Sequence, residues 1–271
     1  VGAGRVGSAL GALLQRAGYK IVGFSSRSSV SLAKSQDLLG VDGSADPAEA
    51  AAKADCIIIS VPDDSVASVC EELCARQALS AESWLMHTSG SLGREALSSA
   101  RSLGAHTLAV HVLQSVPSAL EGIERIPGSW FGVTCDENER DWARVLVADL
   151  GGKALFVDDR DRVRYHLAAV FASNFLVTLA DLAGTTFESV GPYLPLMKGT
   201  LANIAALGTE KALTGPIVRG DAGTVKRHVA AIRGETDLEC YRALSEATID
   251  LAVRSGRLSR EAADGVRKAL Y

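Results

Sequence analysis

Three closely spaced glycines at the start of the chain constrain its fold more than any other feature of the sequence. Residues 2–7 read Gly-Ala-Gly-Arg-Val-Gly, which is the pattern G-x-G-x-x-G. Apolar residues then recur at the spacing of one helix face over residues 4–17, and the apolar segment 19–25 is typical of a strand. A glycine turn that opens a helix, with a strand about 20 residues further on, predicts a strand–turn–helix–strand unit.

The physical roles of these glycines predict a dinucleotide site. Gly2 permits the tight turn, Gly4 lets a pyrophosphate approach the backbone, and Gly7 lets the helix pack closely on a strand. The first helical turn, with Arg5 and Val6, offers free N–H groups and the positive end of the helix dipole to phosphates.

The end of the second strand predicts which dinucleotide binds. NAD-preferring sites usually carry an acid here for the ribose 2′-hydroxyl, but this chain reads Ser25-Ser26-Arg27-Ser28-Ser29. Arg27 can contact a 2′-phosphate through two N–H groups, and the hydroxyls of Ser26 and Ser28 can donate to it. Ser28 or Ser29 can equally cap the next helix. We expect NADP(H) rather than NAD(H).

The first 157 residues alternate between strand and helix patterns, which predicts a doubly wound α/β domain with a parallel sheet. Further helices are expected at 29–39, 47–54, 64–78, 93–102 and 137–150. Further strands are expected at 55–61, 83–88, 105–111, 129–135 and 153–157.

The character of the chain changes at a charge cluster, residues 158–162, and no strand pattern follows it. Helices are expected at 161–183, 188–207, 221–232, 236–255 and 259–270, with Ser259 as an N-cap. We therefore predict a sheet domain at 1–157 and an all-helical domain at 158–271.

Two turns of the predicted sheet end at the edge where open α/β sheets bind ligands. Val61 and Pro62 end one buried strand, and Thr88-Ser89-Gly90 ends the next. We expect both turns to line the nicotinamide ribose, although each taken singly is also an ordinary turn.

Polar residues in three further segments are candidates for the chemistry. His111 ends a predicted strand on the ligand side and is followed by Gln114 and Ser115. A histidine there can donate to a carbonyl oxygen or move a proton during hydride transfer, and it can equally cap a loop.

In the long helix, His166 and Ser173 share a face, and Asn174 lies beside them in an otherwise apolar run. Burying such groups without partners is costly, so they bind substrate or pair with another helix. We favour Asn174 as a substrate ligand, while His166 has equal claims to a structural role.

Residues 213–221 form a turn rich in glycine that leads to Asp221, a good N-cap. Thr214, Gly215 and Arg219 are candidates for binding a carboxylate. The alternative is a turn between helices in which Arg219 pairs with Asp221.

These motifs together resemble a known superfamily. The glycine loop, the turns at 61–63 and 88–90, and the helical second half look like pyrroline-5-carboxylate reductase, ketopantoate reductase and 6-phosphogluconate dehydrogenase. A closer resemblance is to bacterial Rossmann-like oxidoreductases with a C-terminal helical domain of unknown function. It is carried by His111-Val112-Leu113-Gln114-Ser115, by Tyr165-His166 through Ser173-Asn174, and by residues 213–221.

The resemblance implies an NADP-dependent reductase or dehydrogenase. The first motif usually reads His-Pro-Leu-Gln in that family, and Val112 replaces the proline here. In the similar prephenate and arogenate dehydrogenases, a His-Pro loop at this position carries the catalytic histidine. Pyrroline-5-carboxylate reductases hold the substrate carboxylate with a stretch that Thr214 and Pro216 match. Related reductases pair through their helical domains, which predicts a homodimer.

Composition removes several classes of function. The formal net charge is −4, so nucleic acid is not an expected partner. Apolar stretches end short of the roughly 20 residues that a membrane span needs, so no membrane partner is expected. Five scattered cysteines, without a metal-ligand pattern, favour a reducing compartment and a cytoplasmic location. No signal peptide precedes the glycine loop, and its position so close to Val1 suggests that a few residues are missing.

The sequence therefore predicts an NADP(H)-dependent oxidoreductase for a small anionic substrate, such as the keto acid ketopantoate or an imine acid. His111 or Asn174 would polarise the reacting group, with His166 and Gln114 as further catalytic candidates. Ser115, Ser173 and the loop at 214–221 would bind substrate. The alternatives are a non-catalytic NADP-binding sensor and a deazaflavin-dependent reductase of the same fold.

Overall fold

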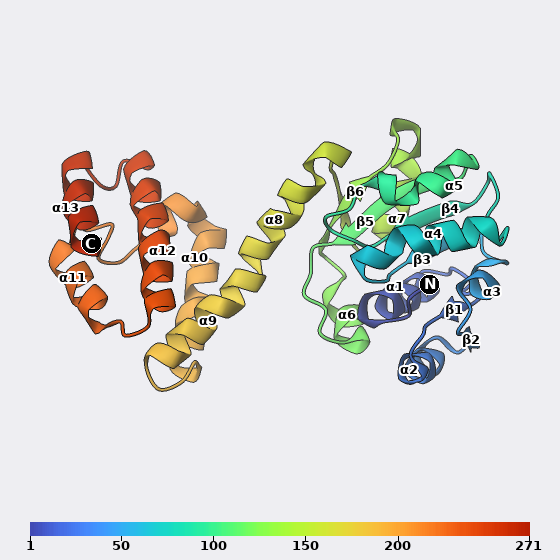
Figure 1. Cartoon of the computed structure of the whole chain (residues 1–271), viewed down its shortest axis with the longest axis horizontal. Helices are drawn as coiled ribbons and strands as arrows, with labels where there is room; N and C mark the ends of the chain where they lie inside the picture. The colour runs from blue at the N-terminus through green and yellow to red at the C-terminus, as the bar shows by residue number, and fades with distance from the viewer. The chain divides into compact units, whose positions relative to one another are not determined.

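The computed structural model describes residues 1–271, and the chain divides into a unit of sheet and helices, Val1–Ser173, and an all-helical unit, Asn174–Tyr271 (Figure 1). The domain join expected at residues 157 and 158 follows β7 directly, and one more helix, α8, belongs to the first unit.

A five-stranded sheet organises the first unit. Its strands are β3 (Cys56–Ile59), β4 (Trp84–His87), β5 (His106–Val112), β6 (Trp130–Thr134) and β7 (Lys153–Phe156), in that spatial order. β3, β4 and β5 are parallel, as are β6 and β7, so the expected parallel-dominated sheet is confirmed.

One pair of strands departs from the expected parallel arrangement, because β6 runs antiparallel to β5. Leu113, just after β5, donates its N–H to the carbonyl of Trp130 at the start of β6, at 2.8 Å. The chain thus re-enters the sheet at the edge where it left, and a strand that starts there must run the other way.

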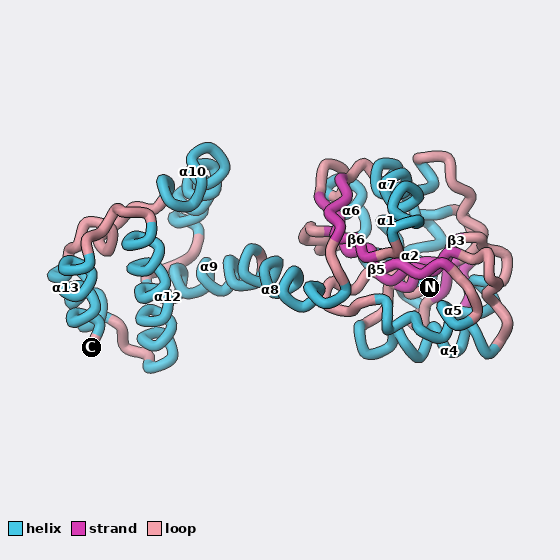
Figure 2. The backbone as a smooth tube through the Cα atoms, turned by 90° about the horizontal axis from the view of Figure 1, so that it is seen from above, coloured by secondary structure: helices cyan, strands magenta, loops and turns pink.

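Helices cover both faces of this sheet, as Figure 2 shows, with α1, α6 and α7 on one side and α4 and α5 on the other. The helices of the unit are α1 (Arg5–Arg16), α2 (Ser29–Leu39), α3 (Pro47–Ala51), α4 (Val66–Ala75), α5 (Ser98–Ser102), α6 (Ala119–Arg125), α7 (Arg140–Asp149) and α8 (Arg162–Ala172). Each face has its own apolar core, one centred on α1, α6 and α7 and the other on α3, α4 and α5.

The strand expected at 19–25 is shorter in the structure. Only β1 (Phe24–Ser25) pairs, with β2 (Gly43–Ser44), in a separate parallel sheet. Next to β3 lies Val1, which donates to the Ile58 carbonyl at 2.7 Å and accepts from the Ser60 N–H at 2.8 Å. A cavity of about 500 Å³ lies among residues of both sheets and is lined mainly by apolar side chains.

The helical unit contains α9 (Asn174–Thr186), α10 (Leu194–Ala212), α11 (Ala222–Ala231), α12 (Glu235–Arg254) and α13 (Arg260–Leu270). Its core comes from α11, α12 and α13 and the turns between them, whereas α9 and α10 contain no buried residue. Ser259 accepts from the Ala262 N–H, which confirms the predicted N-cap of α13.

The helix expected at 161–183 is interrupted. Ser173 has φ −122° and ψ −66°, so α8 ends before it and α9 begins after it. The run Asp159–Thr186 is nevertheless long and apolar enough to cross a membrane, judged by length and composition alone, and none of its apolar window is buried. The expectation that no stretch reaches this length is therefore corrected, although a helix that packs on a partner meets the same criterion.

Candidate active site

The glycine loop has the steric features that its sequence predicts. Gly2 has φ +81°, and a Cβ there would overlap the Ser60 carbonyl oxygen at the end of β3. A Cβ at Gly7 would lie 2.7 Å from the Gly2 carbonyl oxygen and 3.1 Å from Ser60 Cβ. By contrast, a Cβ at Gly4 would meet only one atom, at 3.9 Å. Packing therefore requires Gly2 and Gly7, while Gly4 leaves the space above the loop open to a ligand.

The start of α1 is free to bind an anion. Its N-cap, Gly4, supplies no side-chain acceptor, and Arg5 in the first turn is exposed. The N–H groups of Gly2 and Ala3 are already bonded to the Ser25 carbonyl at the end of β1, at 2.9 and 2.8 Å. These bonds fix the loop beside β1, and the free N–H groups of α1 remain available to a phosphate.

The positively charged side chain in the turn after β1, Arg27, has no partner in the chain. Arg27 is exposed and makes no hydrogen bond or ion pair in this chain. Ser28 accepts from the Ser31 N–H and so caps α2, and Ser26 Oγ accepts from the Ser28 N–H. Capping of α2 and binding of a 2′-phosphate are geometrically compatible, because the N-terminus of α2 and the Arg27 guanidinium lie in the same turn.

A line of contacts connects the glycine loop with the next strand ends. Thr88, after β4, donates its hydroxyl to Ser60 Oγ at 3.2 Å, and Ser60 packs on Gly7. Val61 and Pro62 follow Ser60, with Val61 half-buried and its Cγ1 2.7 Å from where a Gly2 Cβ would be. The two predicted turns thus lie along the same sheet edge as the loop.

The loop after β4, residues 88–93, is held from several sides. Ser89 Oγ donates to Asp63 Oδ2 at 2.8 Å and accepts from the Leu92 N–H at 3.1 Å. Ser91 Oγ donates to the same carboxylate oxygen at 2.9 Å. Asp63, at the end of the Val-Pro-Asp turn, therefore fixes this loop beside β3.

His87, at the end of β4, makes hydrogen bonds near both ends of the loop at residues 88–93. It is fully buried, its Nδ1 accepts from the Ser89 N–H at 3.2 Å, and its Nε2 lies 3.1 Å from the Gly93 carbonyl. Because Nδ1 accepts, Nε2 carries the proton and donates to that carbonyl. Burial lowers the pKa of His87 to about 4, so the ring is neutral at pH 7.

Arg162, the first residue of α8, also makes hydrogen bonds to the loop at residues 88–93. It is fully buried, and its guanidinium donates to three carbonyls, those of Leu92 at 3.1 Å, Gly132 at 3.1 Å, and Ser89. Burial lowers the pKa of Arg162, and the nearby carboxylates of Asp159 and Asp63 oppose this effect. The arginine ties α8 to the loop after β4 and to β6.

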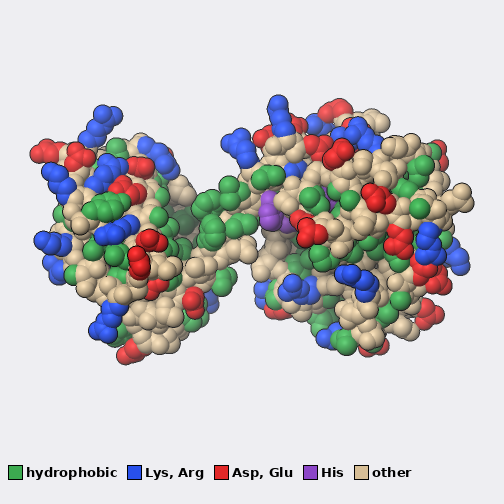
Figure 3. Space-filling view, viewed as in Figure 1, with side chains coloured by type: hydrophobic (Ala, Val, Ile, Leu, Met, Phe, Trp, Pro, Cys, Tyr) green, Lys and Arg blue, Asp and Glu red, His purple; other side chains and the backbone are tan.

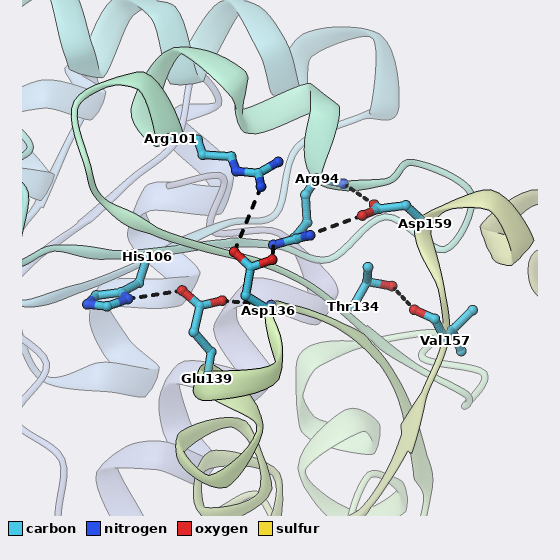
Figure 4. Close-up of polar contacts among 8 residues, drawn as sticks. All are labelled: Arg94, Arg101, His106, Thr134, Asp136, Glu139, Val157 and Asp159. Atoms are coloured by element: carbon cyan, nitrogen blue, oxygen red, sulfur yellow. Dashed lines mark hydrogen bonds and ion pairs between the residues drawn. The ribbon is translucent and has the colours of Figure 1, made fainter.

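A second ionic cluster secures the segment before α8 (Figure 4). Arg94 lies between Asp136, at 2.8 Å from Nη1, and Asp159, at 3.2 Å from Nε. The backbone N–H of Arg94 also donates to Asp159 Oδ1 at 2.8 Å. Asp159 thereby fixes the approach to Arg162, three residues further on.

Two histidines meet at the buried Gly90. A Cβ at Gly90 would overlap Cδ2 of His166 and lie 3.0 Å from Nε2 of His111. The two imidazoles are 5.8 Å apart and nearly perpendicular. The predicted candidates His111, His166 and Gly90 are therefore neighbours within one unit, at the carboxyl ends of β4 and β5.

His111 lies in β5 as predicted, one residue before its end, because the strand continues through Val112, which pairs with Phe131. Its Nδ1 lies 2.9 Å from the phenol oxygen of Tyr165 on α8. Burial, the charge of Arg162 and the proximity of His166 lower the pKa of His111 to about 4, against a smaller raising effect of Asp63. A neutral imidazole here can donate or accept a hydrogen bond at pH 7.

Gln114 and Ser115 lie in the loop beyond this strand and are exposed. The Gln114 amide donates to the Arg125 carbonyl at 3.1 Å and to Ser129 Oγ at 3.2 Å, and its oxygen accepts from the Ser115 N–H. In this conformation, the Gln114 side chain organises the loop itself.

The remaining candidates lie around the start of the helical unit and in its loop. Ser173 ends the first unit, Asn174 begins the second, and both are exposed. In the loop after α10, Thr214 and Arg219 are exposed and Gly215 has φ +106°. The Asp221 carboxylate accepts hydrogen bonds from the N–H and the hydroxyl of Thr224, at 2.9 and 2.6 Å. It makes no ion pair with Arg219. Arg219 is therefore available to an anion.

Sequence reasoning did not single out His87, Asp63, Arg162 or Tyr165 as parts of this site. Asp63 and Tyr165 stood inside motifs that the sequence highlighted, and Arg162 stood in the charge cluster at the join. A charged residue at the first position of a long apolar helix was the available signal for Arg162.

Two family models match the chain and together span most of it. Residues 1–112 match a Rossmann-like domain, and residues 129–248 match a domain of unknown function, DUF2520. This agrees with the resemblance drawn from the sequence. No curated protein matches the sequence.

Solved structures with the same fold cover nearly the whole chain. A protein from Bacteroides fragilis assigned as an NADP oxidoreductase is 22% identical, with a TM-score of 0.77 over 92% of this chain and 96% of that one. The imine reductase of Streptomyces aurantiacus is 18% identical, with a TM-score of 0.65 over 97% and 96%. The reductive aminase of Aspergillus terreus, in complex with NADPH, is 16% identical, with a TM-score of 0.59 over 98% and 89%.

Proposed function

We propose that this chain, which carries a Rossmann-like domain followed by a DUF2520 domain, is an NADP(H)-dependent oxidoreductase that acts on a small carboxylate-bearing carbonyl or imine compound. The observation that carries the proposal is the continuous sheet edge from the glycine loop, through Ser60 and Thr88, to Gly90 and His111. A dinucleotide whose pyrophosphate binds at Gly4 would extend along this edge.

The proposed chemistry needs three groups from the first unit. The start of α1 binds the pyrophosphate, and Arg27 with Ser26 and Ser28 binds the 2′-phosphate. NADPH supplies the hydride when bound. His111, neutral at pH 7, donates a hydrogen bond that polarises the C=O or C=N group. Taken by itself, the second unit offers Thr214, Gly215 and Arg219 as candidates for binding a carboxylate, and Asn174 is a further candidate ligand.

The first experiment measures turnover. Oxidation of NADPH is followed by absorbance against a panel of 2-keto acids, including ketopantoate, and of cyclic imine acids. We expect turnover with at least one class and loss of turnover in His111→Gln. Tight NADPH binding with no turnover across the panel would contradict the oxidoreductase and identify a sensor.

The second experiment tests the cofactor. Arg27→Ala removes a bidentate contact to the 2′-phosphate, so we expect the KM for NADPH to rise roughly 10- to 100-fold and the KM for NADH to change less than about twofold. Arg16→Ala, at the far end of α1, is the matched control for a lost exposed arginine. Equal effects of Arg27→Ala on both cofactors would remove the NADP assignment.

We also propose that the chain forms a homodimer through α9 and α10 of the helical unit. Figure 3 shows hydrophobic side chains at the surface of each unit. In the helical unit, large apolar residues of α9 and α10 are strongly exposed, among them Val177 (70%), Leu196 (68%) and Leu201 (50%). Contiguous exposed apolar surface of this kind marks interaction sites.

The charges on this surface favour a second copy as the occupant. Between residues 174 and 207 the charged residues are Asp181, Glu188 and Lys198, a net charge of −1. With so few charges, a self-complementary interface forms with little like-charge repulsion, and this segment has no cluster of lysines and arginines of the kind that favours anionic membranes.

Light scattering at micromolar concentration tests this proposal. We expect a dimer for the wild type and a monomer for Leu201→Glu, on α10. Leu120→Glu is the matched control, because Leu120 is equally apolar and 68% exposed but lies on α6. A wild-type monomer, or flotation of the wild type with liposomes, would contradict the dimer.

A further inference from the structure

Tyr165 connects three parts of the candidate active site, and the proposed function does not yet use it. Its phenol lies 2.9 Å from Nδ1 of His111, and the two rings meet at 88° with centroids 5.6 Å apart. A Cβ at Gly132 would overlap the phenol ring, so this glycine of β6 makes the room that Tyr165 occupies. The guanidinium of Arg162 lies 5.4 Å from the ring centre.

The contacts of the phenol bear on the direction of the hydrogen bond to His111. The phenol carries one proton and has two nearby acceptors, Nδ1 at 2.9 Å and the His111 carbonyl at 3.5 Å, and the shorter contact is the stronger one. When Tyr165 donates to Nδ1, the neutral imidazole must carry its proton on Nε2.

The Nε2 atom of His111 is the free end of this pair. It makes no hydrogen bond in the chain, and it is not among the polar side-chain atoms that are both fully buried and without a partner. It lies beside Gly90, 3.0 Å from where a Cβ would be, so a side chain at that position would cover it. With its proton on Nε2, His111 presents an unpaired donor beside Gly90 and the His166 ring that packs there.

We propose that Tyr165 is a positioning residue that holds His111 as an Nε2–H donor, ready to bind the carbonyl oxygen or imine nitrogen of the substrate. The proposal rests on the proposed function for the identity of that acceptor, but the state of the imidazole is independent of any substrate. Four groups face His111. Arg162, Tyr165 and His166 come from the first five residues of α8, and Asp63 comes from the turn after β3.

The proposal has a consequence for pH dependence. Burial and the positive charge of Arg162 disfavour the imidazolium, and the pKa of His111 is lowered to about 4. His111 then donates a hydrogen bond as a neutral ring and does not titrate between pH 5 and 8. The rate should therefore show no ionisation of this histidine in that range.

The chain offers a matched control in its other unit. His228 on α11 has its Nδ1 3.0 Å from the phenol of Tyr241 on α12, with ring centroids 5.9 Å apart at 82°. The contact has the same chemistry and almost the same geometry, but it is exposed and lies in the unit that lacks the G-x-G-x-x-G loop.

The deciding measurement is the ¹⁵N NMR spectrum of the histidine side chains of the full chain at pH 7. The His111 signal is assigned by its loss in His111→Gln. We expect a protonated Nε2 and an unprotonated, hydrogen-bonded Nδ1. A His111 protonated on Nδ1 would overturn the proposal, whether or not a substrate has been found.

The variants then separate positioning from a general structural role. In Tyr165→Phe we expect the Nδ1 signal of His111 to shift, kcat to fall roughly 10- to 100-fold, and KM to stay within about twofold. Tyr241→Phe should shift only the His228 signal and leave kcat unchanged. A Tyr165→Phe variant with the wild-type His111 spectrum and wild-type kcat would also overturn the proposal. Failure to find turnover in any variant would count against the proposed function alone.

Discussion

The same side-chain pair occurs once in each unit of the chain, in two different settings. His111 and Tyr165 meet where β5, β6 and α8 come together, and Gly132, Arg162 and Gly90 surround them. His228 and Tyr241 bridge α11 and α12 at the surface. The contact distances differ by only 0.1 Å, at 2.9 and 3.0 Å.

The comparison separates a contact from its environment. Around His111 a buried arginine, a second histidine and a loop fixed by Asp63 and His87 act on the ring, and its pKa is lowered to about 4. His228, by contrast, is exposed on α11, and its partner Tyr241 is only partly buried. A hydrogen bond to a tyrosine does not by itself make a histidine functional, whereas the desolvated and charged setting changes what the ring can do.

Replacing each histidine tests this difference most strongly. If His111 polarises the reacting group, His111→Gln should lower kcat/KM by roughly 10²- to 10⁴-fold, the usual range for a lost acid–base or polarising residue. His228→Gln should leave kcat/KM within about twofold. Steady-state kinetics with the best substrate of the panel decide, and equal losses in both variants would erase the contrast between the pairs.

Acid should destabilise the first unit through its buried histidines. The folded-state pKa values of His87 and His111 are about 4, below the ordinary 6.5, so the unfolded chain binds more protons between these values. Their contribution is complete above pH 6.5 and is lost as the pH falls through this window. At pH 5, the free energy of unfolding should be about 2 kcal/mol lower than at pH 7 for each of these histidines.

Tryptophan fluorescence can follow this effect in the first unit alone, because Trp84, Trp130 and Trp142 all lie there. Urea unfolding of the wild type and His111→Gln is compared at pH 7, 6 and 5. The variant should lose about 2 kcal/mol less than the wild type between pH 7 and 5. An identical loss in both proteins would mean that His111 is not held neutral by its surroundings.

Local sequence signals were enough for much of the fold. Ser259 before an amphipathic run located α13, and the glycine spacing located the turn before α1, because caps and turns depend on neighbouring residues. The reversal of β6 was not predictable in this way, since a strand pattern reads the same in both directions. The break at Ser173 was missed for a related reason, because the apolar pattern continues through it.

The candidate site was predictable only in part. Strand ends and polar residues in apolar runs identified His111, His166 and Gly90. Arg162 and Tyr165 could not be assigned, because their partners lie far away in sequence. Arg162 binds the Ser89 carbonyl 73 residues earlier, and Tyr165 contacts His111 54 residues earlier. No local pattern encodes such contacts, and they decide the setting of His111.

Filling the space under Tyr165 tests that setting directly. The Cβ of Gly132→Ala would overlap the phenol, so Tyr165 must move away from His111 or β6 must shift. Overpacking of this kind typically costs about 1–3 kcal/mol of unfolding free energy. Gly223→Ala is the control, because its Cβ would meet nothing closer than 3.6 Å. Far-UV circular dichroism in urea, which reports on both units, and the ¹⁵N spectrum of His111 should both change in Gly132→Ala only.

The smallest effect is expected at the exposed pair, and it sets the baseline for the comparison. Tyr241→Phe removes a hydrogen bond between half-exposed groups that water can replace, so the free energy of unfolding should fall by less than about 1 kcal/mol. Far-UV circular dichroism in urea is the appropriate measurement, because the tryptophans do not report on the helical unit. A loss of more than about 2 kcal/mol would mean that the phenol of Tyr241 secures α11 to α12. The contrast with Tyr165 would then lie in what the two pairs hold in place, and exposure would no longer explain it.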